Sequence, residues 1–364
     1  MLTKEIASTI VNETSLRLNR NINIMNEKGV IIASGDTKRI GDIHEGALTV
    51  LKTGQTLSIS AEQAEKLKGS QPGINLPIVF QDSIVGVIGI TGHPSEIQIL
   101  GGLVKMATEL MINQNYLSTQ MEWQQRTKEL IIEEMLKATP SYDQIKRRLG
   151  LLEQRLEPPF ISCVLQMNER KISNNTLIKN LELILGEQQG IIGFININRI
   201  FIALSECNFH GTEKVFDKIA AELKRHKINF RLSFSTPFNS LDKFYQSYLD
   251  CDLALDITDN TIDIVPFSKV ESKALIYKTD FPEAAKFSQR IMNKTLEKYS
   301  DTLEAFFENN LNIQSTAQAL FIHRNTLIYR LTKIEKETGY DPKVFMDALT
   351  LQLAIWATKR VERG

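Results

Sequence analysis

An arginine and a histidine lie near a predicted helix start in the segment SGDTKRIGDIHEGALTVLKTG, residues 34–54. Asp42 and Glu45 have the spacing of a capping box, which predicts a helix that ends at the closing glycine of this segment. Arg39 then lies just ahead of the helix N-terminus, and His44 lies close to it. Free backbone N–H groups at a helix start, a guanidinium and an imidazole are all donors for a carboxylate. The segment therefore predicts a site for a small organic acid.

Each of these residues also has a simpler interpretation. Arg39 fits a surface residue paired with Asp36 or Asp42, and His44 fits a helix residue bonded to a backbone carbonyl. It is their combination that favours a site. The glycines of GVIGITG, residues 86–92, mark a bulge or a close approach by a ligand or by a neighbouring helix. The expected ligand-binding residues are Ser34, Arg39, Ile40, Gly41, His44, Thr91 and Gly92.

A second chemical signal is the segment NIQSTAQALFIHRNTLIYRLTKIEKETGY, residues 312–340, which predicts two short helices around a tight turn. Asn312 can cap the first helix, which turns Ala317 and Leu320 inward. The second helix begins at Arg324. Its apolar residues recur at i, i+4 and i+7, which gives one stripe to pack on the first helix. This pattern is typical of a helix-turn-helix.

The second helix concentrates positive charge in a chain that is neutral overall, with 43 basic and 43 acidic residues. Between His323 and Lys336 there are four Lys or Arg residues and a single Glu. A solvated basic face is the ordinary alternative. Asn, Arg, Thr and Tyr in the first turns, where groove-reading residues lie, favour DNA. The expected DNA-binding residues are His323, Arg324, Asn325, Thr326, Tyr329, Arg330 and Lys333.

Length, composition and missing motifs bear on the number of domains and on the other classes of function. The 364 residues predict two or three domains, and 42% apolar residues suffice for their cores. Cys163, Cys207 and Cys251 are too widely spaced for a zinc site, so we expect buried apolar residues in a reducing cytosol. We expect no metal and no cofactor. The chain has no GxxxxGK[ST] or GxSxG motif, so we expect that it is not an enzyme. It has no apolar run of about 18 residues, so we expect a cytoplasmic protein.

The elements that would position the first site form a small α+β domain. Strands are predicted over residues 21–25, 30–34, 75–79 and 84–91, with turns at NEKG and at Gln81, Asp82 and Ser83. Ser95 and Gln98 resemble a second capping box that opens a long helix reaching Lys137. These elements suggest a PAS-like sensor that holds its ligand between sheet and helices.

The long helix carries Leu100, Val104, Ala107 and Met111 in a heptad-like seam that polar residues break, which predicts a short dimer contact. After Pro158 and Pro159, strands are predicted over residues 160–167, 190–196, 199–204 and 230–236. This is a second α+β domain with an antiparallel hairpin.

Three stretches resemble the PucR and sugar-diacid-regulator (CdaR) family. HRNTLIYRLTKIEKETG at residues 323–339 resembles its C-terminal helix-turn-helix. IIASGDTKRIGDIHEGA at residues 31–47 and GVIGITGHPSEIQILGGLVKMATELM at residues 86–111 resemble its sugar-diacid-recognition domain. The middle domain, which ends in FSTPFNSLDKFYQSYLDCDLALDI, resembles a degenerate GGDEF-like domain. The acidic pair that binds Mg²⁺ in true nucleotide cyclases is replaced by Asn196, Ile197, Asn198 and Arg199.

The resemblance implies an α+β multidomain chain with a PAS-like N-terminal sensor, a degenerate nucleotide-cyclase-like middle domain and an all-α helix-turn-helix C-terminal domain. We expect the boundaries 1–135, 136–275 and 285–364. The expected function is a ligand-responsive transcriptional regulator, an activator, that acts as a homodimer on double-stranded DNA. The resemblance implies glucarate, galactarate or glycerate as ligand. The alternatives are a nucleotide cyclase or phosphodiesterase-like enzyme in the middle domain, and a ligand-binding adaptor that does not bind DNA.

Overall fold

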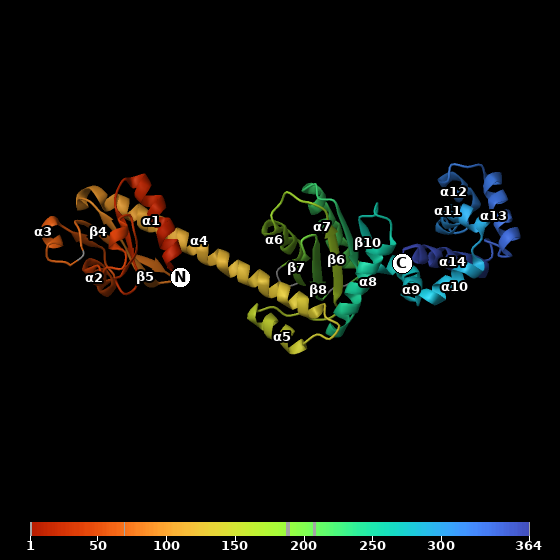
Figure 1. The fold of residues 1–364 in the computed structure, drawn as a ribbon, viewed down its shortest axis with the longest axis horizontal. Helices are drawn as coiled ribbons and strands as arrows, with labels where there is room; N and C mark the ends of the chain where they lie inside the picture. Colours follow the sequence, from red (N-terminus) through yellow and green to blue (C-terminus); the bar gives the residue numbers. More distant parts are fainter. Residues whose placement is uncertain (1, 69, 187–189, 207–208, 364) are drawn as a thin grey trace. The chain divides into compact units, whose positions relative to one another are not determined.

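The computed structural model describes residues 2–68, 70–186, 190–206 and 209–363, with the side chains of 209–212 excepted (Figure 1). Internal contacts divide the chain into two units, Met1–Gln125 and Arg126–Gly364. The long helix predicted from Ser95 exists as one helix, α4 (Pro94–Met135), and it spans the boundary between the units. Both units are mixed α/β, and the second ends in a helical region.

The first unit is built on a five-stranded antiparallel sheet with the order β2-β1-β5-β4-β3. The four predicted strands are confirmed, and the short β3 is additional. Gln81 and Asp82 form the β4–β5 turn with positive φ angles of 48° and 60°, as a two-residue hairpin requires. The strands are β1 (Ile22–Met25), β2 (Ile31–Ser34), β3 (Leu57–Ile59), β4 (Gly73–Phe80) and β5 (Ser83–Thr91).

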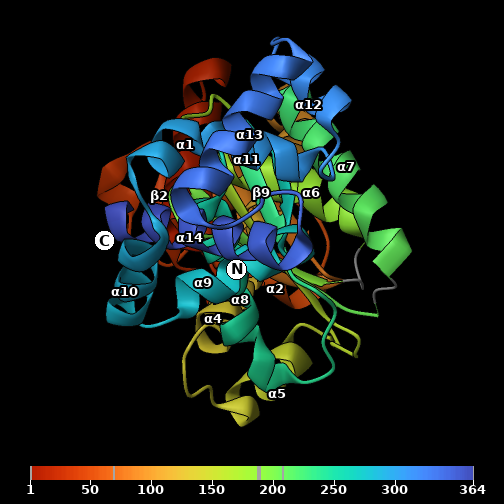
Figure 2. The same cartoon turned by 90° about the vertical axis from the view of Figure 1, so that its right-hand side faces the viewer.

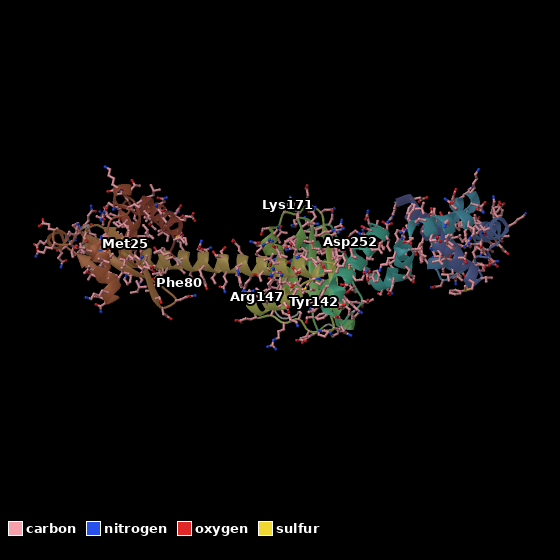
Figure 3. The ribbon with its side chains drawn as sticks, turned by 60° about the horizontal axis from the view of Figure 1, so that its bottom comes forward. Met25, Phe80, Tyr142, Arg147, Lys171 and Asp252 are labelled. Carbon is pink, nitrogen blue, oxygen red and sulfur yellow. The ribbon has the colours of Figure 1, made fainter. Side chains whose placement is uncertain are left out.

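Helices cover both faces of this sheet. Helix α1 (Lys4–Leu18) and the first part of α4 pack on one face in a large apolar cluster. Helix α2 (Glu45–Thr53) packs on the other face in a smaller cluster that contains Met25, labelled in Figure 3. A one-turn helix, η1 (Thr37–Arg39), follows β2, and α3 (Ala61–Ala64) follows β3. Polar side chains on the α2 face are therefore available for a site.

Both expected capping boxes are wrong. Helix α2 begins at Glu45 because His44 is its N-cap, and the His44 Nδ1 accepts the Ala47 N–H at 3.2 Å. Helix α4 begins at Pro94, and the His93 carbonyl accepts the first amides of the helix. A histidine ring can replace the usual Ser or Asp because its unprotonated nitrogen is also an acceptor.

The expected dimer seam on α4 is only partly available for a second helix, and the dimer contact itself stays a prediction. Val104 is 5% exposed and lies in the core of its own unit, with Met111 packed against that core. Leu100 is 36% exposed and Ala107 is half-buried, so the fold uses only part of this seam.

The second unit begins with another five-stranded sheet, in the order β10-β9-β6-β8-β7. Its pairs are antiparallel apart from β9 with β10. The expected hairpin is confirmed as β7 and β8. The strands are β6 (Ile161–Met167), β7 (Gly190–Asn196), β8 (Arg199–Leu204), β9 (Phe230–Phe234) and β10 (Ile264–Pro266). The accompanying helices are α5 (Tyr142–Leu151), α6 (Asn174–Leu185), α7 (Phe209–Arg225), η2 (Leu241–Lys243) and α8 (Phe244–Ile257).

Six helices complete the second unit. Their apolar core gathers side chains from α10, α11, α12, α13 and α14, and Figures 1 and 2 show α11, α12 and α13 together. The helices are α9 (Phe267–Lys278), α10 (Phe281–Ile291), α11 (Lys294–Glu308), α12 (Ile313–Ala319), α13 (Arg324–Thr338) and α14 (Phe345–Arg363).

Two of the three cysteines, Cys163 and Cys251, are free and fully buried in apolar clusters, as expected. Burial raises the pKa of both thiols. Cys207 lies outside the described residues. Across the part of the chain that the structure describes, no helix is long and apolar enough to cross a membrane.

Candidate functional site

A row of small and polar residues crosses the α2 face of the first sheet. The strand register places Ser34 opposite Asn23, Asn23 opposite Gly89, and Gly89 opposite Asn75. Cross-strand partners project from the same face of a sheet. The row therefore presents two buried carboxamides and one hydroxyl, with a glycine between the carboxamides, in the middle of an otherwise apolar surface.

A small open cavity of about 10 Å³, room for about one water molecule, lies above this row. It contains three of the residues expected to bind ligand, Arg39, His44 and Thr91. These come from η1, from the start of α2 and from the end of β5, so the fold joins three separate segments at one place. The complete lining is Asn23, Arg39, His44, Gln71, Gly73, Ile74, Asn75, Gly89, Ile90 and Thr91.

Asn75 lies at the centre of the lining and is 3% exposed. Two glycines make room for its side chain. A Cβ at Gly89 would lie 2.7 Å from its Oδ1, and a Cβ at Gly46 would lie 3.2 Å from its Nδ2. Among the described residues the buried Oδ1 accepts no hydrogen bond. Because an unsatisfied buried acceptor costs about 1 to 3 kcal/mol, a ligand donor at this place would be favourable.

His44 is 3% exposed and has an unusual protonation behaviour. Burial, and the positive charge of Arg39, lower its pKa from 6.5 to about 4, so the ring is neutral near pH 7. Since Nδ1 accepts the Ala47 N–H, the hydrogen of the neutral ring is on Nε2. His44 therefore offers the cavity a neutral N–H donor beside the guanidinium of Arg39.

The other expected ligand residues lie around the cavity without lining it. The Ser34 hydroxyl donates to Asn23 Oδ1 at 2.6 Å and so orients that carboxamide. Ile40 and Gly41 are exposed, and their amides donate to the carbonyls of Thr37 and Ile31. Gly92 follows β5 and its amide donates to a loop carbonyl.

The expectation of free amides at the start of α2 is wrong. The N–H groups of Glu45, Gly46 and Ala47 donate to the Lys68 carbonyl, the Ser70 hydroxyl and the His44 ring. Side chains, rather than this helix end, supply the donors of the cavity.

Sequence reasoning missed Asn23, Asn75, Gln71 and Gly73, and it noted Gly89 only as one of the glycines that mark a bulge or a close approach. A usable signal existed for the two asparagines, because each interrupts a strand whose neighbours are buried and apolar. A buried polar residue requires a partner. The sequence does not show that the two strands are joined through Gly89, because this pairing is non-local.

At the other end of the chain, α12 and α13 form the expected pair of helices. Asn312 caps α12, with its Oδ1 accepting the amides of Gln314 and Ser315 at 3.0 and 2.9 Å. Phe321 makes the turn with a φ of 52°. Leu327 and Leu331 of α13 are buried in the shared core. The stripe therefore fixes which face of α13 remains outside.

Most residues expected to contact DNA lie on that outer face. Arg324, Asn325, Thr326 and Tyr329 are exposed, and Lys333 is half-buried. His323 is exposed, but its Nδ1 accepts the Asn325 N–H at 3.3 Å, so the ring also caps α13.

Arg330 differs from the other basic residues of α13. It is half-buried, its guanidinium donates to the buried Thr302 Oγ1 at 2.9 Å, and it stacks 5.5 Å from the ring centre of Tyr299. Both partners belong to α11, where the helix is kinked at Tyr299. The geometry indicates that Arg330 holds α13 against α11.

In the middle of the chain, the β7–β8 turn contains Ile197 and Asn198, and Arg199 pairs with Asp252 of α8 at 2.5 Å (Asp252 is labelled in Figure 3). Within the described ranges, no three His, Cys, Asp or Glu side chains gather in a way that could hold a metal ion.

Comparisons with known proteins agree with this organisation. Family models match a sugar diacid recognition domain at residues 2–135, a GGDEF-like domain at residues 137–257 and a PucR C-terminal helix-turn-helix domain at residues 299–357. The carbohydrate diacid regulator of Escherichia coli (strain K12) is 29% identical, over 97% of both chains.

Two further relatives are full-length matches. An uncharacterized protein of Haemophilus influenzae is 28% identical over 97% of this chain and 98% of its own. One of Bacillus subtilis (strain 168) is 28% identical over 96% of each chain. In its three domains and over nearly its full length, the chain is similar to the CdaR and PucR sugar-diacid regulators.

Proposed function

We propose that this protein is a transcriptional regulator that binds a small hydroxylated acid in the cavity of its first unit and double-stranded DNA through α13. The observation that carries the proposal is the cavity itself. It combines a guanidinium, a neutral imidazole and a buried unsatisfied carboxamide oxygen on a chain that ends in a helix-turn-helix. The name of the Escherichia coli relative adds a carbohydrate diacid as the ligand class.

The donors of the cavity favour a carboxylate. Arg39 supplies a fixed positive charge and a planar pair of N–H groups, which match the two oxygens of a carboxylate. His44 supplies an uncharged N–H beside it. Because His44 is neutral, the ligand does not have to neutralise two buried cations. We assign the acid group of the ligand to Arg39 and His44.

The sheet side of the cavity favours hydroxyl groups. Asn75 Oδ1 accepts from a hydroxyl, and Thr91 and Gln71 add further polar groups that already contact each other at 3.4 Å. Gly73 and Gly89 have no side chain, so their backbone atoms line the cavity directly. The cavity of about 10 Å³ has room for about one water molecule, so the lining must move apart to admit glycerate or a six-carbon sugar diacid.

The five-stranded antiparallel sheet, with the ligand between it and α2, supports the PAS-like description of the sensor. We keep the domain boundaries 1–135, 136–275 and 285–364 in this proposal. The protein would act in the cytoplasm as a homodimer, with activation as its outcome. The β7–β8 turn has asparagines where a cyclase would need acids, and so we assign the middle domain no enzymatic step.

For the DNA contact, we retain Arg324, Asn325, Thr326, Tyr329 and Lys333. Their side chains lie on the face of α13 that the core does not use, in its first turns and along its outer side. His323 and Arg330 are reassigned as positioning residues, since their ring and guanidinium already hold the start and the inner side of the helix.

A titration of the full-length chain tests both halves of the proposal. Galactarate, glucarate and glycerate are added in a calorimeter, and the protein is then mixed with its own upstream DNA with and without each acid. We expect saturable binding of at least one acid and a change in DNA affinity, with DNA binding that weakens steeply with salt. The adaptor alternative requires acid binding without salt-dependent DNA binding, and the enzyme alternative requires turnover of GTP with Mg²⁺.

A further inference from the structure

Helix α4 carries a line of large apolar side chains that face solvent. They lie on the side opposite the residues that pack on the sheet, such as Ile97, Val104 and Ile112. Scattered apolar residues are normal on a protein surface, but a continuous line is a sign of an interface. The exposed members are Ile99 (82%), Leu103 (54%), Met106 (53%), Leu110 (60%), Leu117 (47%) and Met121 (59%).

The spacing of this line is that of a coiled coil. Leu103, Leu110 and Leu117 are seven residues apart and form one heptad position. Ile99, Met106 and Asn113 are also seven apart and form the other, which continues at Gln120. Met121 lies beside this seam. A mean spacing of 3.5 residues keeps such a seam on one side of a helix that winds around a similar helix.

The second half of the line lies where α4 has no cover. Residues 113 to 124 are exposed, although the Tyr116 ring packs edge-on against Phe80 with 5.2 Å between the ring centres. Tertiary packing of an apolar face, rather than intrinsic propensity, provides most helix stability in proteins. Leu117 and Met121 are exposed on this stretch, so a partner helix that covers them would stabilise it.

We infer that α4 pairs with α4 of a second copy of this chain, parallel and in register, along the line from Ile99 to Met121. This inference rests on the homodimer of the proposed function and names its interface. Covering these side chains would bury on the order of 700 Å² per copy, close to the roughly 800 Å² per partner of a standard protein interface. No charged residue occupies a heptad core position between Ile99 and Met121, so nothing repels an identical helix.

Asn113 determines the orientation. In a parallel, in-register pair, Asn113 lies opposite the Asn113 of the second copy, and the two amides can hydrogen-bond to each other. In an antiparallel pair it would face apolar residues near the centre of the line and lose its partner. Asn113 and the next residue of the same heptad series, Gln120, are polar, and only a parallel in-register pair places each opposite an identical polar side chain.

The mass of the full-length protein in solution tests the pairing. The variant Leu110→Glu with Leu117→Glu places four carboxylates in the seam, and the matched control Asn115→Glu with Thr119→Glu places the same charges on the outer side of the same helix. Light scattering should give twice the mass of one chain for the wild type and the control. The seam variant should give the mass of one chain, with a dissociation constant raised more than 100-fold.

A wild type with the mass of one chain, or a seam variant that keeps the double mass, overturns the inference. Cross-linking tests the orientation: under mild oxidation Leu117→Cys should form a disulfide between two copies, and Ser118→Cys should not. A dimer in which Leu117→Cys does not cross-link overturns the parallel register.

Failure of the interface is distinguishable from failure of the proposed function. The cavity residues lie on β1, β4, β5 and the segments that flank α2, and none lies on α4. The monomeric seam variant should therefore bind the acid with wild-type affinity and lose its preference for DNA with two half-sites. If the wild type binds no acid but dimerises through α4, the sensor proposal fails and the interface stands.

Discussion

The cavity of the first unit holds its functional side chains inside the fold, whereas α13 presents them to solvent. Asn75 and His44 are each 3% exposed, and Tyr329 is 61% exposed. In the cavity, the Ser34 hydroxyl donates to Asn23 and the Ala47 N–H donates to His44, so hydrogen bonds orient these side chains. Substitutions in the cavity should therefore change both binding and stability, while substitutions on the outer face of α13 should change binding only.

The strongest test of this contrast is Arg39→Ala. Removal of the guanidinium takes away the charged hydrogen bonds to the acid, so acid affinity should fall more than about 100-fold, or roughly 3 kcal/mol. DNA affinity without acid should be unchanged. Calorimetry of the full-length protein measures the first quantity and fluorescence anisotropy the second, with the neighbouring exposed Lys38→Ala as the control. Normal acid binding by Arg39→Ala would remove this residue from the site.

The second test uses the pH dependence of stability at His44. Its pKa is lower in the folded chain, about 4, than the usual 6.5, so the unfolded chain takes up a proton first as the pH falls. The stability present above pH 6.5 should be lost as the pH falls from 6.5 to about 4, at up to about 1.4 kcal/mol per pH unit.

The matched variant for this test is His44→Asn, which keeps a capping acceptor for α2 but has no titrating group. Hydrogen exchange of peptides from α2 and β1, recorded between pH 7 and 4 and corrected for the intrinsic rate, should show the excess slope in the wild type alone. Equal slopes in the two proteins would contradict a neutral, buried His44.

The third test compares two arginines on one helix. Arg324→Ala should lower DNA affinity by about 1 to 3 kcal/mol and relax base specificity, with no change in stability. Arg330→Ala leaves the buried Thr302 without its donor, so it should destabilise the helical region by about 1 to 3 kcal/mol. Binding to a panel of DNA sequences and thermal unfolding separate the two effects. The contrast would be wrong if both variants changed the same quantity.

The smallest expected effect is that of Gly89→Ala. The new Cβ would lie 2.7 Å from Asn75 Oδ1, which must move away from its place in the cavity. Acid affinity should fall about tenfold, or roughly 1.4 kcal/mol, while DNA binding stays the same. Gly102→Ala is a suitable control, because a Cβ there meets nothing within 4 Å.

The two regions also differ in how far the sequence predicts them. The helix-turn-helix lies within one continuous segment, so the Asn312 cap, the turn at Phe321 and the buried stripe follow from local spacing. The segment does not show that α11 packs against α13. For this reason the sequence predicted a DNA contact for Arg330, and its hydrogen bond to Thr302 was not foreseen.

The cavity was only partly predictable because its lining comes from separate strands and loops. Arg39, His44 and Thr91 were identified by residue type, yet the role of His44 as helix cap was missed, since a ring nitrogen is an uncommon capping acceptor. Asn23 and Asn75 come together only through the pairing of β1, β5 and β4. On α4, the heptad spacing was visible on two faces, and only the fold determines which face is covered by the sheet.

The two nitrogens of His44 limit how this family can diverge. One holds the first turn of α2 and, in the proposed function, the other donates to the ligand, so a replacement that alters recognition also removes the start of a helix. A lineage that changes its nutrient acid would be expected to retain position 44 and to vary Asn23, Asn75 and Gln71 instead. The histidine would then be the slowly changing part of the site, and the polar row on the sheet the part on which selection acts.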